Sequence, residues 1–524
     1  MLWRRSLLFI SLPLCFLVSL LPAFAQIPPA KPDPLAPRFP AGTGGCSAAA
    51  SASLCEEAAP KILANALGPS PLEENLRRLT DEIGGRMTGS LAMARAVEWA
   101  VAAFRQVGVD NLHTEKYTIP VAWSEGATRL DVLAPVPFSV RLVSAGWSPP
   151  LPAGGVEADV LDVGDGSEAE FARAGASTKG AILLVHSEIG RTWDDLFHDY
   201  LRAPAIIDRA VRSGAAAILW MSTHERRLLY RHQNTFTGEL DRLPQVIVAR
   251  EDAQRLARFL AAGQEVRVRL VMPNRVGGLA EQENVVAEIR GREKPDEFVL
   301  LGAHLDSWEL GTGALDNGCN AALVIEAARA IAATGLRPRR SIRFVLFSGE
   351  EQGMLGSWAY ARAHRGELDR AIAAVIFDEG IGRVTGYSLG GRKDIEAALR
   401  DVLMPIESWG ANQHTADAFV GTDNLDFLLE GVPTLVANQE EANYLPNYHA
   451  ESDTLDKVDI RELKLYTALA AVTVFDIAER RERLGKRQSR AEVEALMKET
   501  GLDKQLETFG LWPQWVEGQR GRQP

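Results

Sequence analysis

The spacing of apolar residues changes along the chain, and each change predicts a different kind of element. Residues 72–79 and 91–107 carry apolar side chains three and four positions apart, the period of a helix, and the second run ends at Gly108. Residues 109–120 have the pattern of a strand. Residues 26–60 are rich in Pro, Ala, Gly and Ser without a sustained period, so we predict a flexible arm there.

A different pattern fills residues 128–273. Short apolar runs punctuated by Gly and Pro predict strands at 156–163, 180–185, 215–221, 245–248 and 266–271. Two helices are predicted at 205–213 and 251–262. We interpret this region as a β-rich inserted domain, which divides the surrounding domain into residues 61–127 and 274–485.

Beyond residue 284 the pattern alternates between strand and helix. Buried strands are predicted at 298–303, 342–348 and 371–377, with helices at 319–333 and 358–364. Such alternation is typical of an α/β fold with a mixed, mainly parallel sheet flanked by helices. Residues 486–524 are predicted to be a polar C-terminal tail.

Composition and charge narrow the class of protein. Hydrophobic residues make up 46% of the 524 residues and charged residues 24%, values that are ordinary for a folded globular chain. The formal net charge is -12, and no segment concentrates basic residues. We therefore expect no nucleic-acid partner.

The first 25 residues have the features of a secretory signal peptide. A basic start is followed by an apolar run at 6–21, which Pro13 interrupts, and by the small-residue cleavage site Ala23-Phe24-Ala25. We predict a secreted or periplasmic protein without a stable membrane anchor after cleavage; an uncleaved anchor is the alternative. A local disulfide between Cys46 and Cys55 is left open, while Cys319 is expected to pack in the interior.

Acidic residues and a histidine follow the three predicted strands at 298–303, 342–348 and 371–377. Because ligands bind beyond the carboxyl ends of strands in open α/β sheets, these side chains should meet at one edge. Carboxylates crowded at a buried edge need cations, and imidazole with carboxylate suits zinc or a similar divalent ion. The side chains are those of His304, Asp306, Asp316, Glu350, Glu351 and Asp378.

Five segments around these residues resemble a known family. They are HLDSWELGTGALDNG at 304–318, GLRPRRSIRFVLFSGEEQG at 335–353, FDEG at 377–380, GTDNLDFLLEGVP at 421–433 and NYHAESDTLDKV at 447–458. The chain is similar to the co-catalytic zinc exopeptidases of the aminopeptidase and glutamate carboxypeptidase type, and most similar to their carboxypeptidase Q branch. The similarity extends from about residue 80 to about residue 480, and the insertion looks like a protease-associated domain.

The resemblance implies two Zn²⁺ ions and assigns the residues that would bind each of them. Asp316 would bridge the two ions. His304 and Asp378 would complete one site, and Glu351 with His449 would complete the other.

The resemblance also implies roles for residues around the metals. Glu350 would be the general base, and Asp306 would orient His304. Asp423 and His414 lie in loops and are weaker predictions for substrate contacts.

Other functions compete with this interpretation. Residues 386–390 match the G-x-S-x-G pattern of serine hydrolases, with Ser388 as nucleophile, although the run before it is short and polar. A non-catalytic relative or a one-zinc enzyme like glutaminyl cyclase is also conceivable from the fold. No predicted ligand position is lost, however, and His304 is present, so both are disfavoured.

The substrate is predicted to be a dipeptide or another short peptide, because the insertion would restrict access to an exopeptidase site. Which end of the peptide is bound stays open. Asp417, Asp423 and Asp426 favour a free amine, whereas Arg383 and Arg392 could bind a free carboxylate. The resemblance leaves a homodimer open as well.

Overall fold

The computed structural model describes residues 52–523. The predicted signal peptide, most of the predicted arm and Cys46 lie outside the described residues, so the disulfide with Cys55 stays untested. Among the described residues, no helix has the length and apolar character that crossing a membrane requires.

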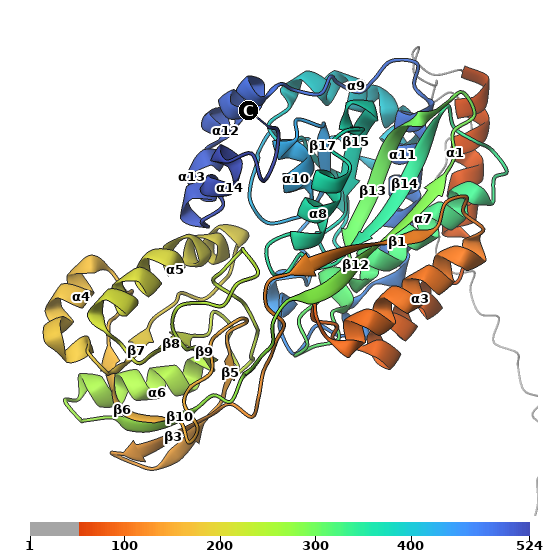
Figure 1. The fold of residues 1–524 in the computed structure, drawn as a ribbon. Coiled ribbons are helices and arrows are strands. Elements are labelled where there is room, and N and C mark those ends of the chain that lie inside the picture. The colour runs from red at the N-terminus through yellow and green to blue at the C-terminus, as the bar shows by residue number, and fades with distance from the viewer. Residues whose placement is uncertain (1–51, 524) are drawn as a thin grey trace, which may run out of the picture. The chain divides into compact units, whose positions relative to one another are not determined.

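A seven-stranded sheet forms the first layer of the fold (Figure 1). Its four central strands, β14, β13, β15 and β17, are parallel, while β12, β1 and β16 pair antiparallel at the edges. The sheet is therefore mixed. In spatial order its strands are β1 (His113–Ile119), β12 (Ala280–Ile289), β14 (Arg340–Phe347), β13 (Lys294–His304), β15 (Ala371–Ile376), β17 (Thr434–Gln439) and β16 (Val384–Ser388).

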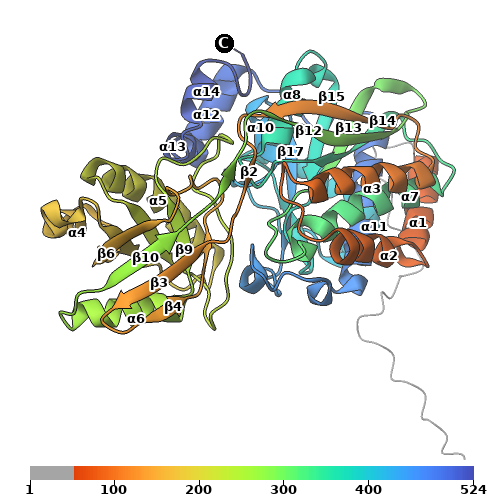
Figure 2. The ribbon, with the colours of Figure 1, turned by 60° about the horizontal axis from the view of Figure 1, so that its bottom comes forward.

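Helices cover both faces of this sheet, because its central strands are apolar on both sides (Figure 2). Along β13, Val299 and Leu301 belong to one core, while Phe298 and Leu300 belong to the other. The first core contains α1 (Ala52–Leu67), α3 (Leu91–Val107), α7 (Cys319–Ala332) and α11 (Ile460–Glu479). The second contains α8 (Leu355–Ala363) and α10 (Asn424–Leu429). The predicted mixed α/β fold flanked by helices is confirmed.

Helix α1 corrects the predicted extent of the flexible arm, 26–60. The helix begins at Ala52, and Ala58, Ile62 and Ala66 are fully buried. These apolar residues recur every four positions, but the surrounding Ala and Pro residues conceal the period, and Pro60 lies inside the helix. Residues 52–60 therefore belong to the core of the fold.

A second sheet of eight strands is built from chain between residues 129 and 271. It is less purely β than predicted, because four of its strands are parallel and helices connect them. The strands, in spatial order, are β4 (Phe138–Val140), β3 (Arg129–Ala134), β10 (Arg267–Val271), β6 (Val156–Asp162), β7 (Ile182–Val185), β8 (Ala217–Met221), β9 (Gln245–Val248) and β5 (Leu142–Ser144). The helices are α4 (Glu168–Ala174), α5 (Trp193–Ser213) and α6 (Arg250–Ala261).

The two segments that connect the first sheet with the second sheet lie side by side. Strand β2 (Trp123–Ser124) pairs antiparallel with β11 (Arg275–Val276), close to the predicted boundaries of the insertion. All described residues nevertheless belong to one compact unit. The division at 127/128 and 273/274 therefore stays a prediction.

The C-terminal segment is folded, which corrects the prediction of a polar tail at 486–524. Helices α12 (Arg490–Thr500), α13 (Leu502–Thr508) and α14 (Trp512–Val516) bury Val493, Leu506 and Trp515. The buried guanidinium of Arg520 pairs with the buried carboxylate of Asp426 at 2.7 Å. The many charged neighbours of these apolar residues concealed their helical spacing.

Candidate metal centre

Three neighbouring strands bring the predicted site residues to one edge of the first sheet. His304 is the last residue of β13, Glu350 and Glu351 follow β14, and Asp378 follows β15. Because these strands are parallel and adjacent, their carboxyl ends lie together, as the sequence predicted.

The loop that carries Asp316 is held by the carboxylate of Asp453. This carboxylate accepts hydrogen bonds from the backbone N–H groups of Ala314, Leu315 and Asp316, at 3.1, 2.7 and 3.1 Å. Asp453 was not singled out in the sequence, although it lies only four residues after His449. Its three hydrogen bonds fix the backbone on which Asp316 stands.

The fully buried Arg86 ties the other side of the same loop to the end of β13. Its guanidinium donates to the carbonyl oxygens of Leu305, Thr312 and Gly313, at 2.5, 2.8 and 2.8 Å. Arg86 lies more than two hundred positions before these carbonyls, so no local pattern could reveal this role.

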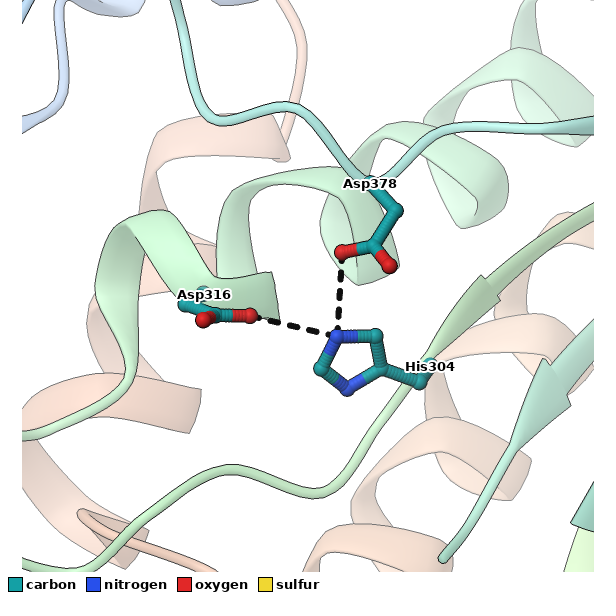
Figure 3. A group of neighbouring side chains, drawn as sticks. All are labelled: His304, Asp316 and Asp378. Carbon is teal, nitrogen blue, oxygen red and sulfur yellow. Dashed lines mark hydrogen bonds and ion pairs between the residues drawn. The ribbon is translucent and has the colours of Figure 1, made fainter. Parts of the chain in front are cut away.

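Asp316 lies between two groups of side chains. Its Oδ1 is 3.2 Å from Nε2 of His304, which is also 3.1 Å from Oδ1 of Asp378 (Figure 3). Its Oδ2 is 3.3 Å from Nε2 of His449, which is also 3.1 Å from Oε2 of Glu351. Within each group of three, one atom of every side chain lies within 4.8 Å of the others. Each group therefore has the spacing to hold a metal ion, and Asp316 is common to both.

The charges at this edge favour a bound cation. Burial raises the pKa of Glu350 well above its usual value and that of Glu351 to about 7. Burial alone would lower the pKa of His449, but Glu351 and Asp316 raise it to about 9. In the metal-free chain a proton on the imidazole thus supplies the positive charge that the carboxylates need. Glu351 also keeps a buried Oε1 without a hydrogen-bond donor among the described residues.

Asp306 differs in detail from the role that the resemblance implied. The Nδ1 atom of His304 lies 3.0 Å from the backbone carbonyl oxygen of Asp306 and 3.6 Å from its carboxylate. The carboxylate instead accepts hydrogen bonds from the hydroxyl of Thr88 and from the N–H groups of Glu350 and Glu351. Asp306 therefore contacts His304 through its backbone and fixes the turn after β14 through its side chain.

Comparisons with known proteins agree with this geometry. Residues 284–474, which include all five predicted ligands, match the model of peptidase family M28. Over this segment the chain is therefore similar to the M28 peptidases. This confirms the resemblance to zinc exopeptidases and the prediction of a metallo-exopeptidase.

Individual relatives cover most of the chain. Carboxypeptidase Q from Rattus norvegicus is 28% identical over 414 residues, which span 78% of this chain and 86% of that protein. Aminopeptidase YwaD from Bacillus subtilis is 23% identical and covers 79% of this chain and 87% of its own length. A solved M28 peptidase precursor from Shewanella amazonensis has a TM-score of 0.75 and 27% identity, covering 83% of this chain and 99% of its own.

The two weaker predictions for substrate contacts, Asp423 and His414, stay predictions, and neither residue lines the cavity at the site. Asp423 is fully buried and does not line the cavity at the site. His414 lies outside the cavity too, and its Nδ1 accepts a hydrogen bond from the N–H of Tyr387 at 3.2 Å.

The geometry also removes the serine-hydrolase alternative. Ser388 is the last residue of β16, is 2% exposed and donates to the carbonyl oxygen of Asp417 at 3.2 Å. His449, which follows Ser388 in the chain as the histidine of a serine-hydrolase triad would, faces Asp316 and Glu351 instead. Ser388 therefore has neither an exposed hydroxyl nor an adjacent histidine base.

A cavity of about 680 Å³ opens onto the metal centre. Other parts of the chain also line it, among them helix α5, the loop between β8 and β9, residues 416–422 and the C-terminal helices. Apolar and aromatic side chains form much of its lining away from the ligands, including Leu196, Phe197, Phe236, Met354, Val420 and Phe509.

Aromatic rings, two of them from the inserted region, stack beside the predicted ligand His449. The rings of Tyr200 and His232 are parallel within 5°, with centroids 3.8 Å apart, and His232 lies 5.9 Å from His449. Tyr448 packs on His449 at 3.7 Å. Apart from Tyr448, which precedes a predicted ligand, these residues carry no sequence signal.

Proposed function

We propose that this M28 enzyme is a dizinc exopeptidase that hydrolyses dipeptides or other short peptides. The sharing of Asp316 between two complete ligand groups carries the proposal, because one four-coordinate ion would not need five ligands. Imidazole nitrogen and carboxylate oxygen are donors that zinc accepts. A non-catalytic or one-zinc relative is disfavoured, since neither group lacks a member.

In this proposal the chain's own residues position the water and move its proton. When bound, a pair of zinc ions would polarise the scissile carbonyl and make water acidic enough to react at neutral pH. Glu350 belongs to neither ligand group and lines the cavity, so its carboxylate is free to accept the proton of the attacking water. It would then pass this proton to the leaving amine.

The size of the cavity supports a short substrate. A volume of about 680 Å³ lies within the range of sites for small molecules. Helix α5 and the loop before β9 belong to residues 128–273 and line the cavity, which supports the proposal that the inserted region restricts access. We also propose that this region is a protease-associated-like domain.

The charges that line the cavity favour a free α-amine. Asp194, Glu379 and Asp417 contribute carboxyl groups, whereas the one lysine in the lining, Lys393, pairs with Glu499 at 3.2 Å. Arg383 and Arg392, the predicted alternatives, do not line the cavity and pair with other acidic side chains. An ammonium group would therefore find partners more readily than a carboxylate.

Location and assembly are inferred from the sequence. The signal-like segment 1–25 supports a secreted or periplasmic enzyme, which acts on peptides outside the cytoplasm. A homodimer remains a proposal from family resemblance.

Dipeptides with one end blocked test the proposed function. We expect acetylation of the amino end to lower kcat/KM at least about tenfold, because a charged contact is lost, whereas amidation of the carboxyl end should cost less. Product analysis by mass spectrometry should show casein to be a poor substrate. Large internal fragments appearing early from casein would contradict an exopeptidase. A larger loss of kcat/KM on amidation of the carboxyl end than on acetylation of the amino end would contradict the preference for a free amine.

Phe509 is expected to select substrates with a large apolar side chain next to the scissile bond. It comes from the C-terminal segment beyond the family match, and its ring lies 4.6 Å from that of Phe236 and 6.2 Å from that of Phe197. In Phe509→Ala, the ratio of kcat/KM for Leu-Leu over Ala-Ala should fall about tenfold, because apolar contact is lost.

A conservative variant and a distant one control this measurement. Phe509→Leu should keep most of the ratio, and Phe259→Ala should not change it, because Phe259 packs against Phe138 in the second sheet. An unchanged ratio of the two kcat/KM values in a folded Phe509→Ala protein would show that Phe509 does not contact the substrate side chain.

A further inference from the structure

His232 places an unused polar group beside the metal centre. It lies in the loop between β8 and β9, within the inserted region, and its ring lines the cavity. The residue is only 9% exposed, and its Nδ1 is buried without a hydrogen-bond partner among the described residues. Buried imidazole nitrogens normally find hydrogen-bond partners, so a histidine that lines a cavity and has an unpaired nitrogen is a candidate for contact with a ligand.

Three consecutive residues fix the position of this imidazole. The N–H of Arg231 donates to the carbonyl oxygen of His449 at 2.9 Å, and the side chain of Gln233 donates to the carbonyl oxygen of Glu351 at 2.5 Å. Between them, the carbonyl of His232 itself accepts the N–H of Gly146 at 2.9 Å. The backbone at His232 is thereby tied to both residues that accompany Asp316 in the second ligand group.

Stacking fixes the orientation of the ring as well. Tyr200 covers one face of the His232 imidazole at 3.8 Å, and the ring lies nearly parallel to that of His449. Because the nitrogen atoms of an imidazole point outward in the ring plane, stacking leaves them free for hydrogen bonds. The result is a rigid polar group whose direction is set before substrate binds.

We propose that His232 donates a hydrogen bond to the carbonyl oxygen of the scissile peptide bond; this rests on the proposed function. When water attacks the carbonyl carbon, the π-electron pair moves to that oxygen, and the N–H of His232 would stabilise the negative charge without giving up its proton. The electron pair returns as the C–N bond breaks, and the leaving amine takes its proton from Glu350. Preorganised donors of this kind lower reaction barriers because they need no reorientation.

Two substitutions at this position separate donation from packing. His232→Phe keeps the stack on Tyr200 but has no donor, whereas His232→Gln keeps an N–H donor but loses the stack. His224→Phe is the matched control, because its ring also packs on a tyrosine, Tyr230, at 4.9 Å but does not line the cavity.

We expect kcat of the His232→Phe variant to fall about a hundredfold with KM changed less than about threefold. His232→Gln should recover at least about tenfold of that loss, and His224→Phe should stay within about threefold of the unmodified enzyme. Zinc content should not change. The affinity for a phosphinate dipeptide analogue, which mimics the tetrahedral state, should fall with His232→Phe and recover with His232→Gln.

Three other outcomes would overturn the proposal. If His232→Phe keeps its kcat and His232→Gln is the poorer enzyme, the ring serves only for packing. If His232→Phe loses zinc, its role is to support His449. If His232→Phe does not fold, His232→Gln alone tests the proposal. A kcat of His232→Gln more than about thirtyfold below that of the unmodified enzyme would then contradict the proposal. Failure of the unmodified enzyme to cleave any dipeptide would instead contradict the proposed function.

Discussion

Replacing Glu350 with Gln is expected to lower kcat for dipeptide hydrolysis at least about a hundredfold while the metal content stays the same. Gln keeps the size and the hydrogen-bonding capacity of Glu but cannot accept the proton of the attacking water, and general-base catalysis contributes about 10²–10⁴-fold. Glu350 stands outside both ligand groups, so its loss should not release an ion. Steady-state kinetics and metal analysis of the same preparation check both parts.

Two further variants control this experiment. Glu351→Gln should lose metal as well as activity, because Glu351 belongs to the second ligand group. Glu326→Gln removes the charge of a buried glutamate that pairs with Arg329 in α7, away from the cavity, and should retain the activity. Metal loss from Glu350→Gln with metal retention by Glu351→Gln would show that the two adjacent glutamates have the opposite roles.

Removing the metal with a chelator is expected to abolish hydrolysis, with less than about one-thousandth of the rate remaining. The proposed reaction depends on polarising the carbonyl and on acidifying water, and no other group in the site supplies both effects. Zinc added back should restore the rate. Full activity after complete removal of metal would contradict the proposal.

Chelation should also change how stability depends on pH. In the metal-free chain the pKa of His449 is raised from 6.5 to about 9 and that of Glu351 from 4.5 to about 7. A raised pKa in the folded state stabilises the fold at low pH, and this contribution is lost as the pH rises through the folded-state value. Between about pH 6.5 and pH 9 the melting temperature of the metal-free protein should therefore fall relative to that of the zinc-loaded protein.

The metal centre could be predicted from the sequence because its signals are local. His304, Glu350, Glu351 and Asp378 each lie at or just after the end of a largely apolar strand, and parallel strands bring their carboxyl ends together. His449 lies after no such strand, and only the resemblance to a family assigned it.

The residues that the sequence did not reveal act through distant contacts. Arg86 reaches carbonyl groups more than two hundred positions away, and His232 comes from the loop between β8 and β9, two strands of the second sheet. The C-terminal helices were missed for a related reason. The side chains of Val493 and Leu506 are buried in one apolar cluster with residues of α10 and of other distant segments, which no local pattern shows.

The bridging position of Asp316 is the central claim, and the zinc content of the purified enzyme tests it most directly. Metal-free protein should be titrated with zinc. At each step the bound zinc is measured by elemental mass spectrometry and the rate of dipeptide hydrolysis is measured on the same sample. The account predicts two equivalents of zinc per chain, with full activity reached only when both are bound. Saturation at one equivalent with full activity would contradict it.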